Sequence, residues 1–340
     1  MAACYATESL ENDVEPSSKI VTNSENWQQL LGSQRDWVWR GWQTRYTYIR
    51  AKQNPKKSNP QEQGNRASIS KPPILLLHGF GASIGHWRKN LGALSQEHTV
   101  YALDLLGFGA SQKAIATYNV NLWVEQVYEF WQTFIQEPVI LIGNSIGSLI
   151  SLTAAAYYPE MVRALAAISL PDPAAQTEAI PPPLLPLVET LQNIIASPPL
   201  LRPIFYLVRK PKVIRRWVKL AYANPDSVTD ELVEILAGPP SDRGSARAFC
   251  ILFRIMGSSK LGPSVKAILP SLEIPILLIW GQQDRLIPPS FAQPERLMEY
   301  NSYLKLVELE NAGHCPHDEC PERVNQLILN WIGEWQPENA

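Results

Sequence analysis

Short apolar runs recur along most of the chain, and polar or amphipathic stretches separate them. Uninterrupted runs of Val, Ile and Leu are typical of strands that are buried on both faces, as in parallel sheets. The runs cover residues 73–77, 99–103, 139–142, 165–170, 276–279 and 304–309. Helical stretches lie between most of them, for example at residues 121–135 and 146–157. The alternation predicts an α/β fold with a mostly parallel central sheet and helices on both faces.

An aromatic and β-branched stretch precedes this alternation. Residues 37–49 contain three Trp and two Tyr, with Gly41 near the middle, and therefore predict two short strands joined by a turn. Residues 1–25 are polar and show no periodicity, which indicates a disordered tail. Residues 52–72 are rich in Lys, Asn, Pro, Ser and Gln and predict a solvated loop.

One long segment interrupts the alternation of strands and helices. Residues 171–271 contain no clear strand, open on several prolines and then show the pattern of several helices. We therefore predict a core formed by residues 26–170 and 272–340, with residues 171–271 inserted as a helical cap. The cap should lie over the carboxyl ends of the strands.

Basic and apolar residues are interleaved in the middle of the predicted cap. Between Glu189 and Asp226 no residue is acidic, whereas seven are basic: Arg202, Arg209, Lys210, Lys212, Arg215, Arg216 and Lys219. This mixture suits peripheral contact with an anionic membrane, or with a long apolar substrate. In the alternative interpretation, the apolar residues pack the cap onto the core and the basic residues form its solvated face.

Composition and charge narrow the class of protein. The 340 residues are 45% hydrophobic and 18% charged, which is typical of a globular protein with a large core. A net charge of −2 gives no indication of a nucleic-acid partner. The acidic N-terminus lacks the apolar core of a signal peptide, and no apolar run is long enough to span a membrane, so we expect a cytoplasmic protein, soluble or peripheral.

The four cysteines are scattered along the chain as Cys4, Cys250, Cys315 and Cys320. No second ligand pair accompanies the two close ones, so the pattern predicts reduced thiols and no metal site. No sequence feature indicates a cofactor, and none indicates an oligomeric state.

A nucleophile motif follows the third predicted core strand. Gly143-Asn144-Ser145-Ile146-Gly147 matches the G-x-S-x-G elbow, in which a strand turns sharply into a helix and exposes a serine. An apolar strand precedes the motif here, and a helix rich in small residues follows it. Both are the context that the motif requires, so we predict Ser145 as the nucleophile.

The other members of a serine triad should follow in the order acid, then base. Asp284 comes after a buried strand and a turn, where we expect an exposed carboxylate, and Asp172 is the alternative acid. His314 follows the last predicted strand and a small Ala-Gly pair, and His317 is the competing base. We assign His314 as the general base that accepts the proton of Ser145, and Asp284 as the acid that orients His314. The remaining histidines are interpreted as structural: His78, His86 and His98.

An oxyanion hole requires two main-chain N–H groups near the nucleophile. Ile146, directly after the serine, should supply one of them. Phe80, in the glycine-rich loop at residues 78–81, should supply the other. Asp104 precedes the serine and is expected to brace the loop at residues 107–109.

Taken together, these motifs resemble those of the α/β-hydrolase superfamily from about residue 37 to residue 335. The motifs are His78-Gly79-Phe80-Gly81, Asp104-x-x-Gly107-x-Gly109-x-Ser111, the elbow, Trp280-Gly281-x-x-Asp284 and Gly313-His314. Dehalogenases and epoxide hydrolases on this fold carry an aspartate at the elbow, so Ser145 speaks against their alkyl-enzyme chemistry.

A narrower resemblance is to the chloroplast and cyanobacterial hydrolases related to pheophytinase. It rests on Trp39-Arg40-Gly41, Arg45-Tyr46, His86-Trp87-Arg88-Lys89-Asn90 and Thr229-Asp230-Glu231-Leu232-Val233-Glu234. The resemblance implies cleavage of the phytyl ester of chlorophyll pigments. The chain departs from the family at Ser148, where a second glycine is frequent, and in its proline-rich cap segment 171–203.

The sequence therefore predicts a serine hydrolase that cleaves carboxylic esters of a hydrophobic substrate, such as a phytyl or other long-chain ester. A thioesterase, a carbon–carbon bond hydrolase or a cofactor-free haloperoxidase would use the same residues. A different class is a hydrophobic-ligand binding protein or receptor that retains the triad with little turnover.

Overall fold

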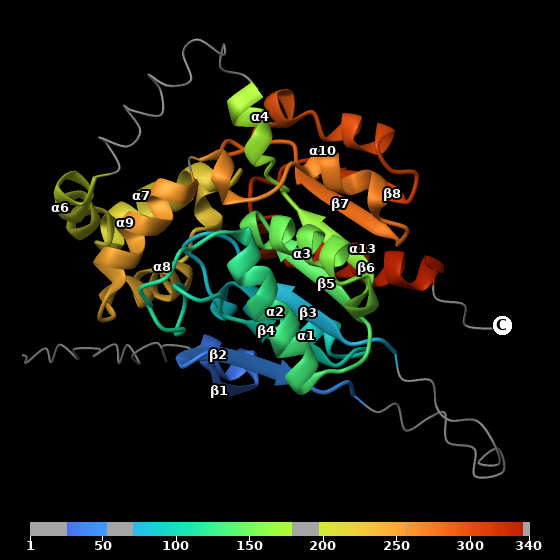
Figure 1. The fold of residues 1–340 in the computed structure, drawn as a ribbon, viewed down its shortest axis with the longest axis horizontal. Helices are drawn as coiled ribbons and strands as arrows, with labels where there is room; N and C mark the ends of the chain where they lie inside the picture. The colour runs from blue at the N-terminus through green and yellow to red at the C-terminus, as the bar shows by residue number, and fades with distance from the viewer. Residues whose placement is uncertain (1–25, 53–70, 179–196, 257, 336–340) are drawn as a thin grey trace, which may run out of the picture.

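The computed structural model describes residues 26–52, 71–178, 197–256 and 258–335 (Figure 1). The predicted N-terminal tail lies outside the described residues. So do most of the predicted loop at 52–72 and the cap residues 179–196.

An eight-stranded sheet in the order β1-β2-β4-β3-β5-β6-β7-β8 forms the centre of the molecule. Strands β3 to β8 are parallel, and the β1–β2 hairpin adds an antiparallel edge through pairing of β2 with β4. The strands are β1 Ser33–Trp39, β2 Trp42–Ile49, β3 Ile74–Leu77, β4 Val100–Leu103, β5 Val139–Asn144, β6 Val162–Ile168, β7 Ile276–Gly281 and β8 Leu304–Leu309. The predicted mostly parallel sheet is confirmed.

Local backbone turns end strands β1 and β6. Arg40 and Gly41 both have positive φ, 50° and 84°, and this conformation closes the predicted hairpin between β1 and β2. Strand β6 ends at Ile168, two residues before the predicted end, because Ser169 adopts a φ of 51° and turns the chain out of the sheet. It also begins earlier than predicted, at Val162.

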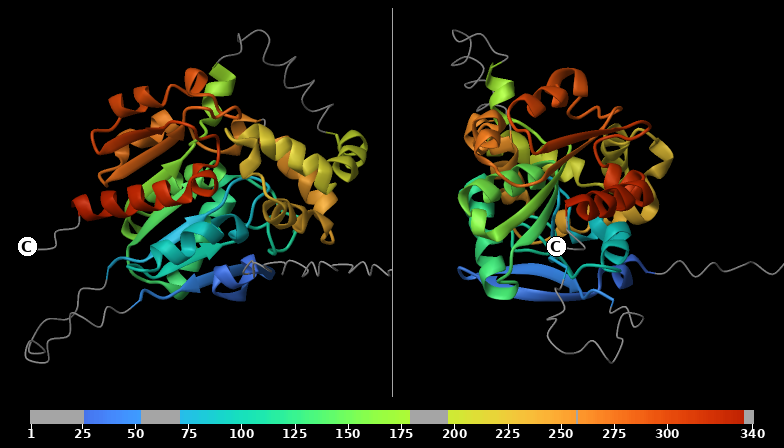
Figure 2. Two further views of the ribbon diagram at one scale, coloured as in Figure 1. Left: turned by 180° about the vertical axis from the view of Figure 1, so that it is seen from behind. Right: turned by 90° about the vertical axis from the view of Figure 1, so that its right-hand side faces the viewer.

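Alternate residues of each parallel strand supply the cores on opposite faces of the sheet. Leu75 and Leu77 of β3 belong to the core beneath α2 (Val120–Phe134) and α3 (Ile146–Tyr157). Ile74 and Leu76 belong to the core beneath α1 (Arg88–Leu94) and α13 (Pro321–Trp335). Figure 2 shows these two helical layers on either side of the sheet. The predicted helices on both faces are thus present.

The described part of the predicted cap consists of helices and contains no strand. They are α4 Pro173–Glu178, α6 Pro198–Val208, α7 Pro211–Ala221, α8 Asp230–Ala237, α9 Ser245–Met256 and α10 Val265–Ile268. Helices α6 to α9 lie together to one side of the sheet in Figure 1, whereas α4 and α10 lie near β7. Across the residues that the structure describes, no helix has both the length and the apolar character needed to cross a bilayer.

Candidate active site

Ser145 occupies a strained turn between β5 and α3. Its φ and ψ are 53° and −120°, a conformation that side chains rarely adopt. A Cβ on Gly143 would lie 2.3 Å from the carbonyl carbon of Gly147, and one on Gly147 would lie 2.2 Å from the carbonyl oxygen of Leu77. Both positions therefore require glycine, and the tight packing holds the strained serine in place.

His314 and Asp284 form a direct pair. The Nδ1 atom of His314 lies 2.8 Å from Oδ2 of Asp284, and both side chains are buried. The second carboxylate oxygen accepts the main-chain N–H groups of Leu286 at 2.9 Å and Ile287 at 2.8 Å. A carboxylate held in this way fixes the imidazole with Nδ1 as the donor and leaves Nε2 free to accept a proton.

The prediction of an exposed carboxylate at Asp284 is wrong. Only 3% of the residue is accessible to solvent. The physical reason is that its oxygens are taken up by the loop's own N–H groups and by His314, so no water is needed to satisfy them.

Asn144 joins the elbow to the loop at residues 310–315, which carries His314 and is called the histidine loop. Its side-chain Nδ2 donates to the carbonyl oxygen of His314 at 3.1 Å. A Cβ on Gly281, at the end of β7, would lie 2.1 Å from the carbonyl oxygen of Gly313, so this loop also packs closely on the neighbouring strand. The residue beside Ser145 thus positions the main chain of His314 directly. Sequence reasoning assigned no role to Asn144, because it stands at a variable position of the motif.

The glycine-rich loop after β3 lies against the elbow. A Cβ on Gly79 would lie 2.8 Å from Oδ1 of Asn144 and 3.4 Å from Cβ of Ser145. Phe80 follows directly, and Ile146 is the first residue of α3 after Ser145. The segments that carry the two predicted oxyanion donors therefore meet at Ser145, as an oxyanion hole requires.

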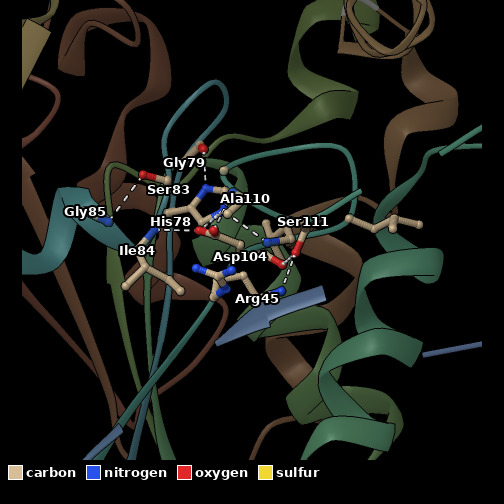
Figure 3. Close-up of polar contacts among 12 residues, drawn as sticks. Arg45, His78, Gly79, Ser83, Ile84, Gly85, Asp104, Ala110 and Ser111 are labelled. Carbon is tan, nitrogen blue, oxygen red and sulfur yellow. Dashed lines mark hydrogen bonds and ion pairs between the residues drawn. The ribbon is translucent and has the colours of Figure 1, made fainter. Parts of the chain in front are cut away.

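His78 holds this loop through both ring nitrogens (Figure 3). Nδ1 donates to the carbonyl oxygen of Gly79 at 2.7 Å, and Nε2 accepts the N–H of Leu105 at 3.1 Å. The ring can serve both partners only when it is neutral. Burial lowers the pKa of His78 to about 4, consistent with this neutral form. The structural role that the sequence predicted for His78 is confirmed.

Asp104 braces the loops next to the site, as the sequence predicted (Figure 3). Its two carboxylate oxygens accept the N–H groups of Ile84 and Ala110, each at 2.7 Å. Burial raises the pKa of Asp104 to about 6, although these two hydrogen bonds favour the ionised form. Gly109 is required because a Cβ there would lie 2.2 Å from the Asp104 carboxyl group. The hydroxyl of Ser111 donates to the Asp104 carbonyl at 2.7 Å, which accounts for the last residue of the motif.

Ser148 ties the helix of the elbow to β6. Its buried hydroxyl accepts the N–H of Ile168 at 2.9 Å and lies within donating distance of the carbonyl oxygens of Gly143, at 2.7 Å, and Ile168, at 2.9 Å. Ser148, which stands where the family often has glycine, therefore adds buried hydrogen bonds at the base of the elbow. Only the tertiary pairing of β5 with β6 reveals it.

We expect Ser148→Ala to lower the free energy of unfolding by about 1–3 kcal/mol, since it leaves the buried N–H of Ile168 without its partner. Ser151→Ala is a matched control in the same helix: it is equally buried, but its hydroxyl only donates to the carbonyl of Gly147. It should cost clearly less. Urea unfolding of both variants measures the difference, and equal losses would remove the special role of Ser148.

The two alternative residues lie in other surroundings. His317 is fully buried between Trp87 and His86, with ring centroids 4.3 Å and 4.6 Å away, and neither ring nitrogen has a partner among the described residues. Asp172 accepts the N–H groups of Ala174 at 3.0 Å and Val265 at 3.3 Å, and so fixes the start of α4. His317 therefore packs among aromatic rings, and Asp172 holds main-chain groups at the start of α4 and α10.

The cap contacts the histidine loop through the end of α7. The N–H of His314 donates to the carbonyl oxygen of Ala221 at 2.7 Å. The hydroxyl of the next residue, Tyr222, donates to Asp318 at 2.7 Å and lies 3.1 Å from Nε2 of the buried His86. Ala221 is far from His314 in the sequence, and no local pattern marks either cap residue, so sequence reasoning missed this contact.

Buried neutral histidines should make stability depend on pH. Burial lowers the pKa of both His78 and His86 to about 4, and that of His317 well below its ordinary value. The unfolded chain takes up protons on these rings near pH 6.5, whereas in the folded chain His78 and His86 do so only near pH 4. Stability present above pH 6.5 is therefore lost as the pH falls toward 4.

At pH 5 we expect a loss of about 2 kcal/mol for each of His78 and His86 relative to pH 7.5. Asp104, with its raised pKa, opposes this by about 1 kcal/mol. The net loss should thus reach about 3 kcal/mol or more, measured by urea unfolding at both values. His86→Gln should flatten the profile, and a profile equally steep in this variant would contradict the assignment.

Comparison with known proteins agrees with the fold of this chain. A family model described as alpha/beta hydrolase fold matches residues 72–321. Chloroplastic pheophytinase from Arabidopsis thaliana is 25% identical over 330 residues, an alignment that covers 85% of this chain and 66% of the relative. The chain thus spans slightly less than two thirds of the length of that protein. Epoxide hydrolase 4 from Homo sapiens is 24% identical over 299 residues, covering 85% of this chain and 79% of the relative.

A solved structure is similar over nearly the whole chain. It is that of a membrane phospholipase A described as a bacterial virulence factor, with a TM-score of 0.66 and 26% identity. The match covers 91% of this chain and 88% of the phospholipase.

Proposed function

This chain belongs to the α/β-hydrolase fold family, and on that basis we propose that it cleaves carboxylic esters through an acyl intermediate on Ser145. The observation that carries the proposal is the buried His314–Asp284 pair, which Asn144 connects directly to the strained elbow. The similarity to a pheophytinase and to an epoxide hydrolase supports the broader class, a hydrolase. The serine mechanism and the ester substrate are our proposal.

In the proposed reaction, the Ser145 hydroxyl attacks the ester carbonyl while Nε2 of His314 accepts its proton. Asp284 keeps the proton of the imidazole on Nδ1 and stabilises the imidazolium that forms. The main-chain N–H groups of Phe80 and Ile146 stabilise the oxyanion. His314 then gives its proton to the departing alcohol. A water molecule, deprotonated by the same histidine, releases the acid and regenerates Ser145.

The similarity to an epoxide hydrolase suggests a second reaction, which the elbow residue disfavours. A carboxylate that opens an epoxide forms an ester, and water can hydrolyse that ester. A serine that opened an epoxide would form an ether, which water does not cleave under the same conditions. With Ser145 at the elbow, ester hydrolysis completes a catalytic cycle, whereas epoxide opening does not.

We further propose that the substrate is a long, apolar ester. The support is the similarity to a pheophytinase and to a membrane phospholipase, together with the exposed apolar side chains of the cap. A panel should contain p-nitrophenyl esters of increasing chain length, a phospholipid, a phytyl pigment ester, an acyl thioester and an epoxide. We expect turnover of the oxygen esters, with kcat/KM rising with chain length. Ligand binding without turnover of any member would indicate a binding protein instead.

The acid of the proposed triad can be tested with two matched changes. Asp284→Asn should lower kcat by about 10²–10⁴-fold, because the amide no longer stabilises the imidazolium and can favour the wrong tautomer. Asp172→Asn changes the same atoms in a residue that accepts the main-chain N–H groups of Ala174 and Val265, and it should leave kcat within a few-fold. Steady-state kinetics of both variants decide between the two carboxylates. A larger loss at Asp172 would reverse the assignment.

A further inference from the structure

Exposed apolar side chains are concentrated on three cap helices. Seven of the sixteen large hydrophobic side chains that are exposed in the described residues lie on α6, α7 and α9. These helices have only 11, 11 and 12 residues. The seven are Leu200, Ile204, Tyr206, Leu207, Trp217, Leu220 and Phe253. Helix α6 packs against both α7 and α9, and exposed apolar side chains gathered on neighbouring helices are typical of an interaction surface.

The packing of α6 explains why part of it stays exposed. Leu201 and Phe205 point inward, and the Phe205 ring lies 5.2 Å from that of Phe249 on α9. The residues of a second stripe, Leu200, Ile204 and Leu207, follow the helical spacing of four and three positions and stay exposed. The helix therefore has one apolar face for the cap and another apolar face turned outward.

Helix α7 repeats this division. Its inward side includes Val218 and Ala221, which pack against Tyr222 and α8. Trp217 and Leu220 are exposed, Trp217 to 60%. The packing interpretation of the cap thus accounts for its inner residues, and the outer residues remain to be explained.

We call the exposed apolar residues of α6 and α7, with the basic residues beside them, the cap face.

The charge on the cap face has one sign. None of the residues of α6, α7 or α9 is acidic. Lys210, Lys212, Arg216 and Lys219 are exposed, and no ion pair is recorded for them within the described ranges. By contrast, Arg215 of the same helix is already paired with Asp230. Four free cations among exposed Leu, Ile and Trp complement a surface that is negative outside and apolar beneath.

We propose that the cap face docks onto a membrane that carries anionic lipid. A bilayer matches both properties of the face, because basic side chains can reach its anionic headgroups while apolar side chains enter the acyl boundary. Trp217 and Tyr206 suit the interfacial region, where amphipathic rings are favoured. Helices that lie in the interface in this way need not span the bilayer.

The cap face lies close to the proposed active site, so docking would also place this site near the membrane. Helix α7 runs from Pro211 to Ala221, and the carbonyl of Ala221 accepts the N–H of His314 at 2.7 Å. One residue thus separates the exposed Leu220 from the histidine loop. Docking would bring the site next to the bilayer, where long-chain esters dissolve. This consequence rests on the proposed function, whereas the docking itself does not.

Vesicle flotation of the full chain tests the docking apart from the chemistry. The protein carries Ser145→Ala, so no lipid is consumed, and the vesicles contain phosphatidylcholine alone or mixed equally with phosphatidylglycerol. We expect flotation with the anionic vesicles, weakening as salt is raised, because salt screens surface charges. Flotation that is absent with anionic vesicles would overturn the proposal.

Two double variants separate the apolar and basic parts. Trp217→Ser with Leu220→Ser, and Lys212→Glu with Lys219→Glu, should each lower the vesicle partition coefficient by about tenfold or more. Phe291→Ser with Arg296→Glu changes the same kinds of exposed residue outside the cap and should leave partitioning unchanged. Melting temperatures close to the parent protein confirm that the variants are folded. Cap variants that partition like the control would contradict the proposal.

Two further results distinguish other outcomes. If the cap face joins two copies of the chain, sedimentation will show a dimer that the Trp217 and Leu220 changes dissociate, without vesicle binding, and the membrane proposal fails. In the active protein, the cap variants should retain hydrolysis of a short water-soluble ester while losing activity on vesicle-borne esters. Vesicle binding without hydrolysis of any ester would leave the docking intact and refute the proposed function alone.

Discussion

Replacing Ser145 by alanine should reduce ester hydrolysis by roughly 10⁴-fold or more, with no change of fold. The hydroxyl is the proposed nucleophile, so the variant keeps only the catalysis that substrate binding and the oxyanion hole provide. Alanine lacks one oxygen and meets the same backbone strain at a φ of 53°, so the melting temperature should stay close to that of the parent protein. Measurements of kcat/KM and thermal unfolding on one preparation test both parts.

Ser151→Ala is the control for this change, because it removes from helix α3 a buried hydroxyl that donates to the main-chain carbonyl of Gly147 rather than to a proposed reacting group. Its kcat/KM should remain near that of the parent protein. If Ser145→Ala retained activity within tenfold, at an unchanged melting temperature, Ser145 would not be the nucleophile.

A comparably large loss is expected for His314→Ala. The imidazole carries the proton in both halves of the proposed reaction. Asp284 cannot replace it, because Asp284 contacts Nδ1 of His314 and not the Ser145 hydroxyl in the proposed mechanism. His317→Ala should leave kcat within a few-fold of the parent. It should instead lower the free energy of unfolding by about 2–4 kcal/mol, because it opens a cavity between Trp87 and His86. Kinetics and urea unfolding of both variants separate catalysis from packing.

The combination of changes provides a further check on His314. If Ser145 and His314 act as one unit, the double variant should be about as inactive as either single variant. A double variant whose losses multiply would show that the two residues act independently. A large kinetic loss at His317 with a small one at His314 would exchange their roles.

The apolar pattern was sufficient to predict the inner strands of the sheet, because β3, β5 and β7 are buried on both faces. Strand β8 was predicted at its observed bounds, and helix α3 likewise. The bounds of β6 were harder, since its end depends on the conformation of Ser169 rather than on hydrophobicity. Ser145 could be identified because the glycines of the elbow are imposed by contacts with Gly147 and Leu77 that any such turn must make.

Long-range contacts could not be predicted in the same way. The burial of Asp284 depends on main-chain donors in its own loop and on a partner thirty residues away. The link from Ser148 to Ile168 depends on strand pairing, and that from Ala221 to His314 on the docking of the cap. In each case the contact forms only when distant segments meet, so no local pattern in the sequence specifies it.

In the cap, too, the sequence could not predict which apolar side chains are buried. A run of basic and apolar residues does not reveal which side chains face the core. In the structure, Leu201 and Phe205 are buried while Leu200 and Ile204, one position earlier in each case, are exposed. The inner and outer faces of this helix are thus both apolar, so the sequence alone could not decide between packing onto the core and an interaction surface.

Covalent labelling with a fluorophosphonate, followed by peptide mass mapping, tests the central claim most directly. The reagent reacts with serines that a neighbouring base activates, so it reports on the nucleophile without requiring the natural substrate. We predict a single adduct on the peptide that contains Ser145, absent in Ser145→Ala and strongly slowed in His314→Ala. An adduct on another residue, or labelling of Ser145→Ala at the parent rate, would contradict the account.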